Sequence, residues 1–188
     1  AIALRPERLP GDVEHGGASG AIGFGYSADS GATWIDGGSL PLGPHVRHWI
    51  SDPVVTVDER RQTFYLVAMA ITEHPRNAIA VLRGRFVGTA LQWDIPIAAR
   101  VVRDTLPDKP WAIADSTNGN VYITYTTFFQ VGGTQQDQIE FQRSRDGGTH
   151  WESPQVLSSA AELGLVQGSR PAVGPDGEVL TTWMAVDT

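Results

Sequence analysis

Charged side chains precede a proline at three similarly spaced positions of the sequence. Asp52, Lys109 and Arg170 each stand directly before a proline, and these prolines are 57 and 61 positions apart. A carboxylate accepts hydrogen bonds from hydroxyl groups, whereas ammonium and guanidinium groups donate them to anionic oxygens. Asp108 and Trp111 flank the second of these positions, and an indole ring offers a flat apolar surface on which a sugar ring can stack. The five residues together predict a site for a polar, sugar-like ligand.

The segments around these prolines share one pattern. Each proline precedes four strand-forming residues and an Asp in a turn, and each turn is followed by a second apolar run, at 63–71, 120–129 and 178–186. Turn sequences such as Asn-Gly-Asn and Pro-Asp-Gly between the runs are typical of hairpins. We therefore predict that each proline opens a strand and that the three charged residues occupy equivalent places.

A second motif is repeated 117 positions apart. Both copies follow an alternating, strand-like run and read as hairpin turns. An Asp in such a turn accepts backbone N–H groups, a glycine supplies positive φ, and a Trp buries apolar surface beside the hairpin. The motif residues are Ser27, Asp29, Gly31 and Trp34 in the first copy and Ser144, Asp146, Gly148 and Trp151 in the second.

The pattern S-x-D-x-G-x-x-W resembles the Asp-box, or bacterial neuraminidase repeat, of sialidase-like β-propellers. The resemblance implies an all-β propeller of four-stranded antiparallel sheets, called blades, in which the box joins the third and fourth strands at the rim away from the central pocket. It also implies a structural, non-catalytic role for the eight box residues. Trp34, Trp93 and Trp151 are 59 and 58 positions apart, which is a blade-sized period. The middle copy keeps only its Trp and is degenerate.

The repeats amount to about three blades in a single domain, residues 1–188. We expect the outer strand pair of one blade at about 20–42, complete blades at about 50–102 and 108–158, and the inner pair of another at about 169–187. Residues 1–19 read as loop, and 158–165 as a short helix. Propellers typically have four to eight blades. Either the chain is a piece of a longer, six-bladed propeller, or two chains join head to tail, each completing the split blade of the other.

The resemblance places ligands at the channel mouth, where inner strands begin and the loops between second and third strands project. The five residues before and around the prolines belong there, and the loops add His74, Arg76 and a polar loop over 130–138. The structural alternative is that the acids cap turns, the bases pair with them, Trp111 packs between blades, and His74 and Arg76 are solvated surface.

The catalytic residues of active sialidases cannot be placed in this sequence. The family's Phe/Tyr-Arg-Ile-Pro arginine signature is absent, and the four tyrosines, Tyr26, Tyr65, Tyr122 and Tyr125, fall within predicted strands. The leading hypothesis is a propeller that recognises glycans, with hydrolysis by an exo-sialidase-like glycosidase left open. The alternative is a non-catalytic scaffold or protein-interaction propeller.

Composition excludes several other classes. The net charge of the 188 residues is -7, without a basic run, which argues against nucleic acid. There is no cysteine, no 18-residue apolar run, and no phosphate- or dinucleotide-binding glycine motif, so we expect no membrane span and no cofactor. The five histidines lack metal-ligand spacing, so no metal is expected. The chain starts at Ala1, and the family resemblance implies a secreted or cell-surface protein of a bacterium.

Overall fold

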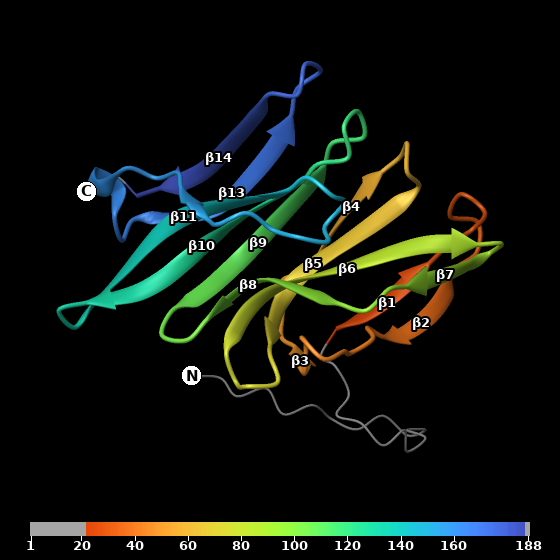
Figure 1. Ribbon diagram of the computed structural model, residues 1–188, viewed down its shortest axis with the longest axis horizontal. Coiled ribbons are helices and arrows are strands. Elements are labelled where there is room, and N and C mark those ends of the chain that lie inside the picture. The colour runs from red at the N-terminus through yellow and green to blue at the C-terminus, as the bar shows by residue number, and fades with distance from the viewer. Residues whose placement is uncertain (1–21, 187–188) are drawn as a thin grey trace.

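The computed structural model describes residues 22–186, and the loop expected over 1–19 lies outside this range. Antiparallel strands form four successive sheets (Figure 1). The first sheet contains β1 (Gly23–Tyr26) and β2 (Ile35–Ser39). The second contains β3 (His48–Trp49), β4 (Val54–Asp58), β5 (Thr63–Ile71), β6 (Asn77–Val87), β7 (Ala90–Trp93) and β8 (Ile97–Val102). The third contains β9 (Leu106–Ala114), β10 (Val121–Val131), β11 (Thr134–Ser144) and β12 (Gln155–Val156). The fourth contains β13 (Val166–Val173) and β14 (Val179–Ala185).

The second sheet is a four-stranded blade with two interrupted strands. Both β3 and β4 pair with β5, and both β7 and β8 pair with β6. The inner strand of this blade is therefore interrupted between β3 and β4, and its outer strand between β7 and β8. The predicted outer pair, two complete blades and inner pair are therefore confirmed within 22–186. The expected short helix is a single 3-10 turn, Ala160–Glu162.

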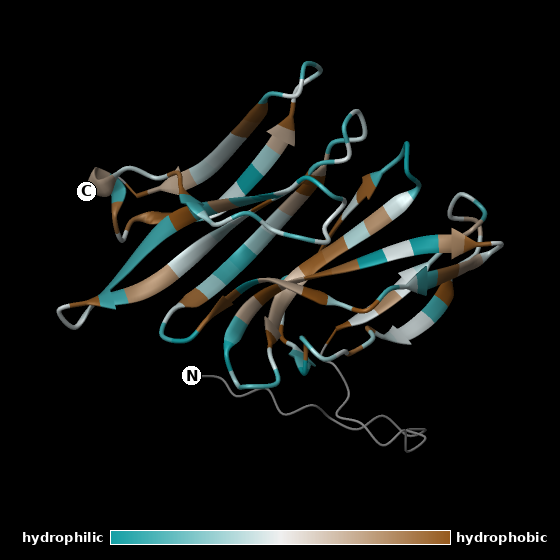
Figure 2. Ribbon diagram, in the orientation of Figure 1, coloured by the Kyte–Doolittle hydropathy of each residue, from teal (hydrophilic) through white to brown (hydrophobic). Residues whose placement is uncertain are grey.

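Successive sheets pack face to face through apolar clusters. One cluster joins the first and second sheets and includes Trp49, Leu66 and Leu82. Another joins the second and third sheets and includes Val67, Ile79 and Ile123, with Trp151 packed at its margin. Figure 2 shows the brown, hydrophobic segments along β5 and β6, the strands whose side chains alternate between these two clusters.

The turns after the inner strands also connect neighbouring sheets. Glu59 donates its backbone N–H to the Ser116 hydroxyl at 3.0 Å, and Arg61 donates from Nη2 to the Asn118 carbonyl at 3.1 Å. Arg61 is held by an ion pair with buried Asp58 at 3.0 Å. Asp58, the turn Asp of the repeated pattern, thus stabilises its own turn. It also orients Arg61, which reaches the corresponding turn of the third sheet.

Two expectations about strand limits were wrong. Prolines do not open the inner strands of the third and fourth sheets, because β9 begins at Leu106 and β13 at Val166, ahead of Pro110 and Pro171. Both strands lie at the edges of their sheets, where a proline's missing N–H donor can face the open side. The polar segment 130–138 is a long hairpin whose strands continue to Val131 and resume at Thr134, so the loop is only the turn between them.

Candidate functional site

Two of the charged residues before prolines occupy backbone bulges in inner strands. Asp52 lies between β3 and β4 with a φ of 54°, and Lys109 lies inside β9 with a φ of 50°. The pairing of β9 with β10 shifts register between Trp111 and Asp108, which leaves Lys109 as the extra residue. Positive φ in a residue with a Cβ is costly and concentrates at functional sites, and bulges re-aim side chains next to active sites.

Arg170 follows a different local geometry. It pairs with Thr182 in the ladder between β13 and β14, whereas the positive φ of this strand, 67°, falls at Gly168. The bulge of the fourth sheet therefore lies two residues before Arg170, the position that the spacing of the prolines predicts. Glycine adopts positive φ without the Cβ penalty, so the bulge has settled at Gly168.

The structure brings four of the predicted binding residues together in pairs. The guanidinium carbon of Arg170 lies 4.3 Å from the centre of the Trp111 ring, a cation–π contact between the third and fourth sheets. Lys109 Nζ pairs with Asp108 Oδ2 at 3.2 Å, and the Lys109 backbone N–H donates to Asp108 Oδ1 at 2.9 Å. We call Asp52, Asp108, Lys109, Trp111 and Arg170 the inner-strand group.

Exposure within the inner-strand group is consistent with ligand access. Asp52, Lys109 and Arg170 are exposed, and Asp108 and Trp111 are half-buried. Asp52 accepts a hydrogen bond from the Ser51 hydroxyl at 3.1 Å, and no ion pair within 22–186 joins it to the other four residues. The placement of Asp52, Lys109 and Arg170 on one rim, opposite the box turns, stays a prediction.

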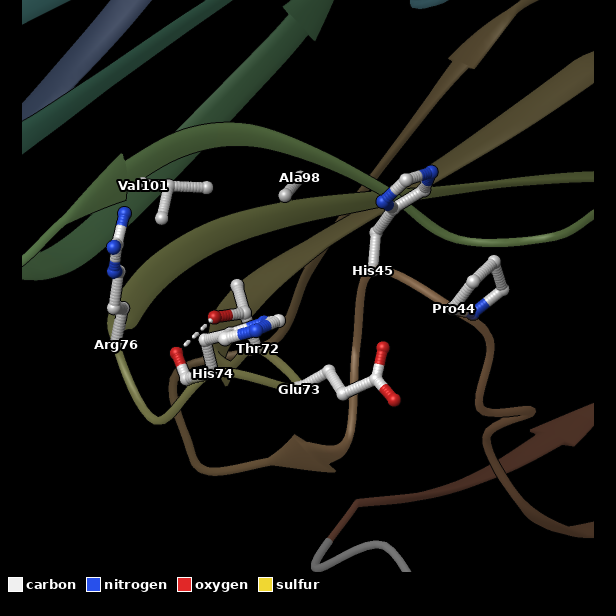
Figure 3. Close-up of a pocket in the computed structure, with 8 residues that line it drawn as sticks. All are labelled: Pro44, His45, Thr72, Glu73, His74, Arg76, Ala98 and Val101. Atoms are coloured by element: carbon white, nitrogen blue, oxygen red, sulfur yellow. Dashed lines mark hydrogen bonds between the residues drawn. The ribbon is translucent and has the colours of Figure 1, made fainter.

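His74 and Arg76 line a separate open hollow of about 550 Å³ (Figure 3). Its other polar lining residues are His45, Thr72 and Glu73. The Thr72 hydroxyl donates to the His74 carbonyl at 2.8 Å, which closes the tight loop between β5 and β6. In Figure 3, Arg76 and His45 lie at opposite ends of the hollow. The sequence did not reveal it, because its walls come from loops and from β8, which are distant in the chain.

A second hollow, of about 370 Å³, lies between the second and third sheets. It is lined by the start of β6, the connection from β8 to β9, the end of β10 and the start of β11. Two of its lining residues are hydrogen-bonded, since Asn77 donates from Nδ2 to the Thr105 carbonyl at 3.0 Å. The sequence indicated only the polar character of the 130–138 segment here. The remaining lining residues are Arg103, Asp104, Leu106, Phe128, Phe129, Gln130 and Gln135.

All four tyrosines lie in strands, as predicted. The most enclosed, Tyr125, is fully buried and donates its hydroxyl to Gln142 Oε1 at 2.8 Å. Burial raises the pKa of Tyr125, and the nearby Glu140 carboxylate raises it further. Glu140 in turn pairs with Arg100 across the sheet boundary at 3.5 Å. A neutral, buried phenol of this kind stabilises the interface and is not an accessible nucleophile.

The two box turns have the same internal hydrogen bonds. In the first, the backbone N–H of Gly31 donates to Ser27 Oγ at 2.9 Å and that of Thr33 to Asp29 Oδ1 at 2.9 Å. In the second, Gly148 and His150 make the equivalent bonds, to Ser144 Oγ at 2.8 Å and to Asp146 Oδ1 at 2.9 Å. In both turns the Ser hydroxyl also donates to the Asp carboxylate.

These bonds hold both carboxylates in the charged form. Hydrogen bonds from the Ser27 hydroxyl and from Thr33 lower the pKa of Asp29 to about 2. Partial burial acts to raise the pKa of Asp146, but the bonds from His150 and Ser144 outweigh it and hold this pKa well below the ordinary value. Each carboxylate thus has its acceptor capacity engaged within the turn.

Across 22–186, no group of three or more His, Cys, Asp or Glu side chains is placed to hold a metal ion. None of the helical segments described there is long and apolar enough to cross a membrane.

Comparison with solved structures relates this arrangement to known proteins. A Hadza microbial sialidase matches with a TM-score of 0.54 and 13% identity over 83% of this chain and 39% of that one. The chain has a partial β-propeller fold. An endo-arabinase from Bacteroides thetaiotaomicron also matches, at 12% identity over 80% of this chain and 76% of that one, with a TM-score of 0.34. The propeller chain thus spans less than half the length of the sialidase. No family model and no curated protein sequence matches it.

Proposed function

We propose that this chain is part of a sialidase-like, Asp-box propeller that recognises glycans through the inner-strand group. The observation that carries the proposal is the stacking of Arg170 on Trp111 at 4.3 Å. A guanidinium stacked on an indole face keeps its in-plane N–H donors free for a carboxylate or sugar hydroxyls. In the described residues Arg170 makes no ion pair with a protein carboxylate, so these donors are available to a ligand.

The other members of the group supply complementary chemistry. The exposed carboxylate of Asp52 and the half-buried one of Asp108 accept hydrogen bonds from sugar hydroxyls. Lys109 presents an ammonium group that Asp108 orients. Held on bulged strands, these groups are positioned by the backbone rather than by flexible loops, which favours pre-organised binding. We propose the same carbohydrate role for the hollow lined by His74 and Arg76.

We assign the eight box residues to the structural Asp-box role, because their polar groups are engaged within the turns. A propeller that acts on glycans of other cells or of the medium operates outside the cell, so we propose secretion or display at the cell surface. The remainder of the ring is a required partner in this view, because within residues 22–186 two of the four sheets have only two strands.

Binding can be tested by titration calorimetry with two probes, the methyl glycoside of N-acetylneuraminic acid and neutral lactose. We expect the acidic sugar to bind and Arg170→Gln to weaken it by roughly ten- to a hundred-fold, the loss of a hydrogen bond to a charged group. The matched control is Arg60→Gln, which removes an exposed arginine from the turn after β4 and should leave affinity unchanged. Equal affinities for wild type and Arg170→Gln would refute the assignment of the site.

Turnover is tested separately by release of the fluorophore from 4-methylumbelliferyl N-acetylneuraminate. Hydrolysis that Arg170→Gln abolishes, with folding intact by circular dichroism, supports an enzyme built on this site. Binding without turnover supports a recognition module. Absence of binding to sialylated and neutral glycans across a broad glycan array would overturn the proposal.

A further inference from the structure

The second hollow, of about 370 Å³, has aromatic rings and several polar side chains on its walls. These walls come from the second and third sheets, whose strands all lie inside residues 22–186. A volume of this size falls within the range of about 300 to 1,000 Å³ that is typical of small-molecule sites. The inner-strand group is not among the described residues that line it, so the hollow is a separate feature of the surface.

The hollow forms where the hairpin of β10 and β11 extends beyond β9. The pairing of β10 with β9 ends at Phe128 opposite Leu106, whereas its pairing with β11 continues to Val131. Figure 1 shows this hairpin projecting past β9. The connection from β8 to β9 lies beside the projecting part, because its residues 103–105 line the same hollow. The longer hairpin and the connection thus form two sides of a recess.

The polar groups around the hollow are free to bind a ligand. Arg103, Asp104, Gln130 and Gln135 are all exposed. Within the described residues, their side chains make no hydrogen bond or ion pair with the rest of the protein. Two amides, one carboxylate and one guanidinium are therefore available as donors and acceptors.

This mixture of groups fits a neutral sugar unit. Phe128 and Phe129 are half-buried, and an aromatic ring offers a flat apolar surface to the C–H face of a sugar. The two glutamine amides both donate and accept hydrogen bonds, as sugar hydroxyls do. Arg103 and Asp104 carry opposite charges at adjacent positions, so the hollow has no net charge that would select an anion.

The second hollow lies one step along β9 from the inner-strand group. Leu106 lines the hollow, and Asp108 belongs to the group. The two pair in regular register with β10, and alternate residues of a strand point to the same side and lie about 6.5 Å apart. This spacing is comparable to the length of one sugar unit. A glycan held by Asp108 and its neighbours would therefore place its next unit at the hollow.

The bulge at Lys109 brings the Trp111 ring into the same row. In a regular strand Trp111 and Asp108, three positions apart, would point to opposite sides. The extra residue corrects this, because the two residues pair with Thr124 and Thr126, which share a face of β10. Both threonines are buried, whereas Asp108 and Trp111 are half-buried. A ligand therefore reaches the row from the β9 edge of the third sheet.

We propose that the second hollow binds a neutral sugar unit that is linked to the sugar held by the inner-strand group. The ligand is then an oligosaccharide that runs along β9, with an acidic unit against Arg170 and Trp111 and a neutral hexose beside Phe128 and Gln135. This assignment rests on the proposed function, because the inner-strand group has to hold the first unit. It adds the minimum length of the ligand and the direction in which the ligand lies.

Titration calorimetry with two ligands measures the contribution of the hollow. The trisaccharide sialyllactose carries neutral lactose on its acidic sugar, and the methyl glycoside of N-acetylneuraminic acid lacks it. We expect the trisaccharide to bind at least about tenfold more tightly. Gln135→Ala should weaken the trisaccharide by about three- to tenfold, as expected for the loss of a neutral hydrogen bond, and should leave the affinity for the methyl glycoside unchanged. Arg170→Gln should weaken both ligands.

The matched control is Gln92→Ala. Gln92 is an exposed glutamine on β7 that pairs with Arg85, near the other end of β6 from the hollow. This substitution should alter neither affinity. Loss of methyl glycoside binding in Gln135→Ala would contradict a separate subsite, because the substitution would then disturb the whole face of the third sheet.

The hollow can also be tested without the inner-strand group. Lactose should bind it weakly, so we expect millimolar lactose to shift the side-chain amide signals of Gln130 and Gln135 in the NMR spectrum of the Arg170→Gln variant. The Gln92 signals should stay in place.

The outcomes separate this assignment from the proposed function. Equal affinities for the two acidic ligands, or lactose that shifts no amide signal of the hollow, would overturn the neutral subsite while the proposed function stands. Methyl glycoside that fails to bind, with the lactose shifts retained, would refute the proposed function and keep the hollow as a site for a neutral sugar.

Discussion

Arg83 and Thr149 join two successive blades by a hydrogen bond of 2.8 Å between Nη1 and Oγ1. The same guanidinium pairs through Nε with Asp94 on its own sheet at 3.1 Å. Its position is therefore fixed from one side while it holds the box turn on the other. The interface between the blades thus combines an apolar cluster with a directional polar contact at its margin.

Removing either partner of this contact should loosen the interface. We expect Arg83→Met to lower the free energy of unfolding by about 1.5 to 3 kcal/mol, because bonds to a charged donor are lost. Thr149→Val should cost less. In a double-mutant cycle by urea denaturation the coupling energy should be about 1 kcal/mol. A coupling near zero would show that the two side chains do not interact in solution.

The two box tryptophans should respond differently to truncation. Trp151→Ala should destabilise the chain by about 2 to 3 kcal/mol, below the full cost of a deeply buried Trp because this ring is only half-buried. Trp34→Ala should leave the unfolding of the monomer within about 0.5 kcal/mol of wild type, since its ring is exposed there. Thermal melts at low protein concentration compare the two, and similar losses would contradict the difference in packing.

Gln142 fills three hydrogen-bonding roles inside the protein. It accepts from the Tyr125 hydroxyl at 2.8 Å and donates to the carbonyls of Ala99 and Glu152 at 3.2 and 2.8 Å. Gln142→Met keeps the volume but leaves these buried groups without partners, so we expect a loss of about 3 kcal/mol or more in chemical denaturation. The control Gln130→Met, at an exposed position, should be nearly neutral.

Acid should weaken the second box turn in a predictable direction. The pKa of Asp146 is lower in the folded chain than its ordinary value of 3.8, so the unfolded chain binds the proton first as pH falls. The stabilisation is fully present above about pH 4 and is lost as pH drops through the folded pKa. Asp146→Asn still accepts the backbone N–H groups but cannot titrate.

Melting temperatures from pH 5 down to 2.5 test this linkage. The decrease should be smaller for Asp146→Asn than for wild type. Asp176→Asn is a suitable control, because the carboxylate at this exposed position accepts no hydrogen bond from the described residues. Its profile should run parallel to wild type, and an identical slope in all three proteins would exclude a role for the Asp146 charge.

The blades could be predicted because their signals are local and repeated. Apolar runs of strand length, hairpin turn residues and box motifs recur at similar intervals, and the four sheets follow them closely. The box turns were predictable in detail for the same reason, since each consists of contacts between residues at most four positions apart. Trp34 and Trp151 share a motif but not an environment, which depends on the neighbouring sheet and not on the local sequence.

The candidate site was less predictable. The spacing of the prolines placed Arg170 with Lys109, yet the bulge of β13 lies at Gly168, where a glycine adopts the positive φ without a Cβ penalty. The Trp111–Arg170 stacking joins different sheets, and the hollow around His45 joins loops and an outer strand. Contacts of this kind depend on how sheets are placed relative to one another, which no local pattern encodes.

The apolar clusters that pair the first sheet with the second and the second with the third also shape the order of folding. Because each sheet is covered by its neighbours in sequence, stability should spread along the chain as in a one-dimensional array. Amide hydrogens of β5, β6 and β10 should exchange slowest, and those of β1, β2 and β14 fastest. During synthesis the second sheet can complete as soon as its strands leave the ribosome, and it then provides the surface on which the third sheet assembles.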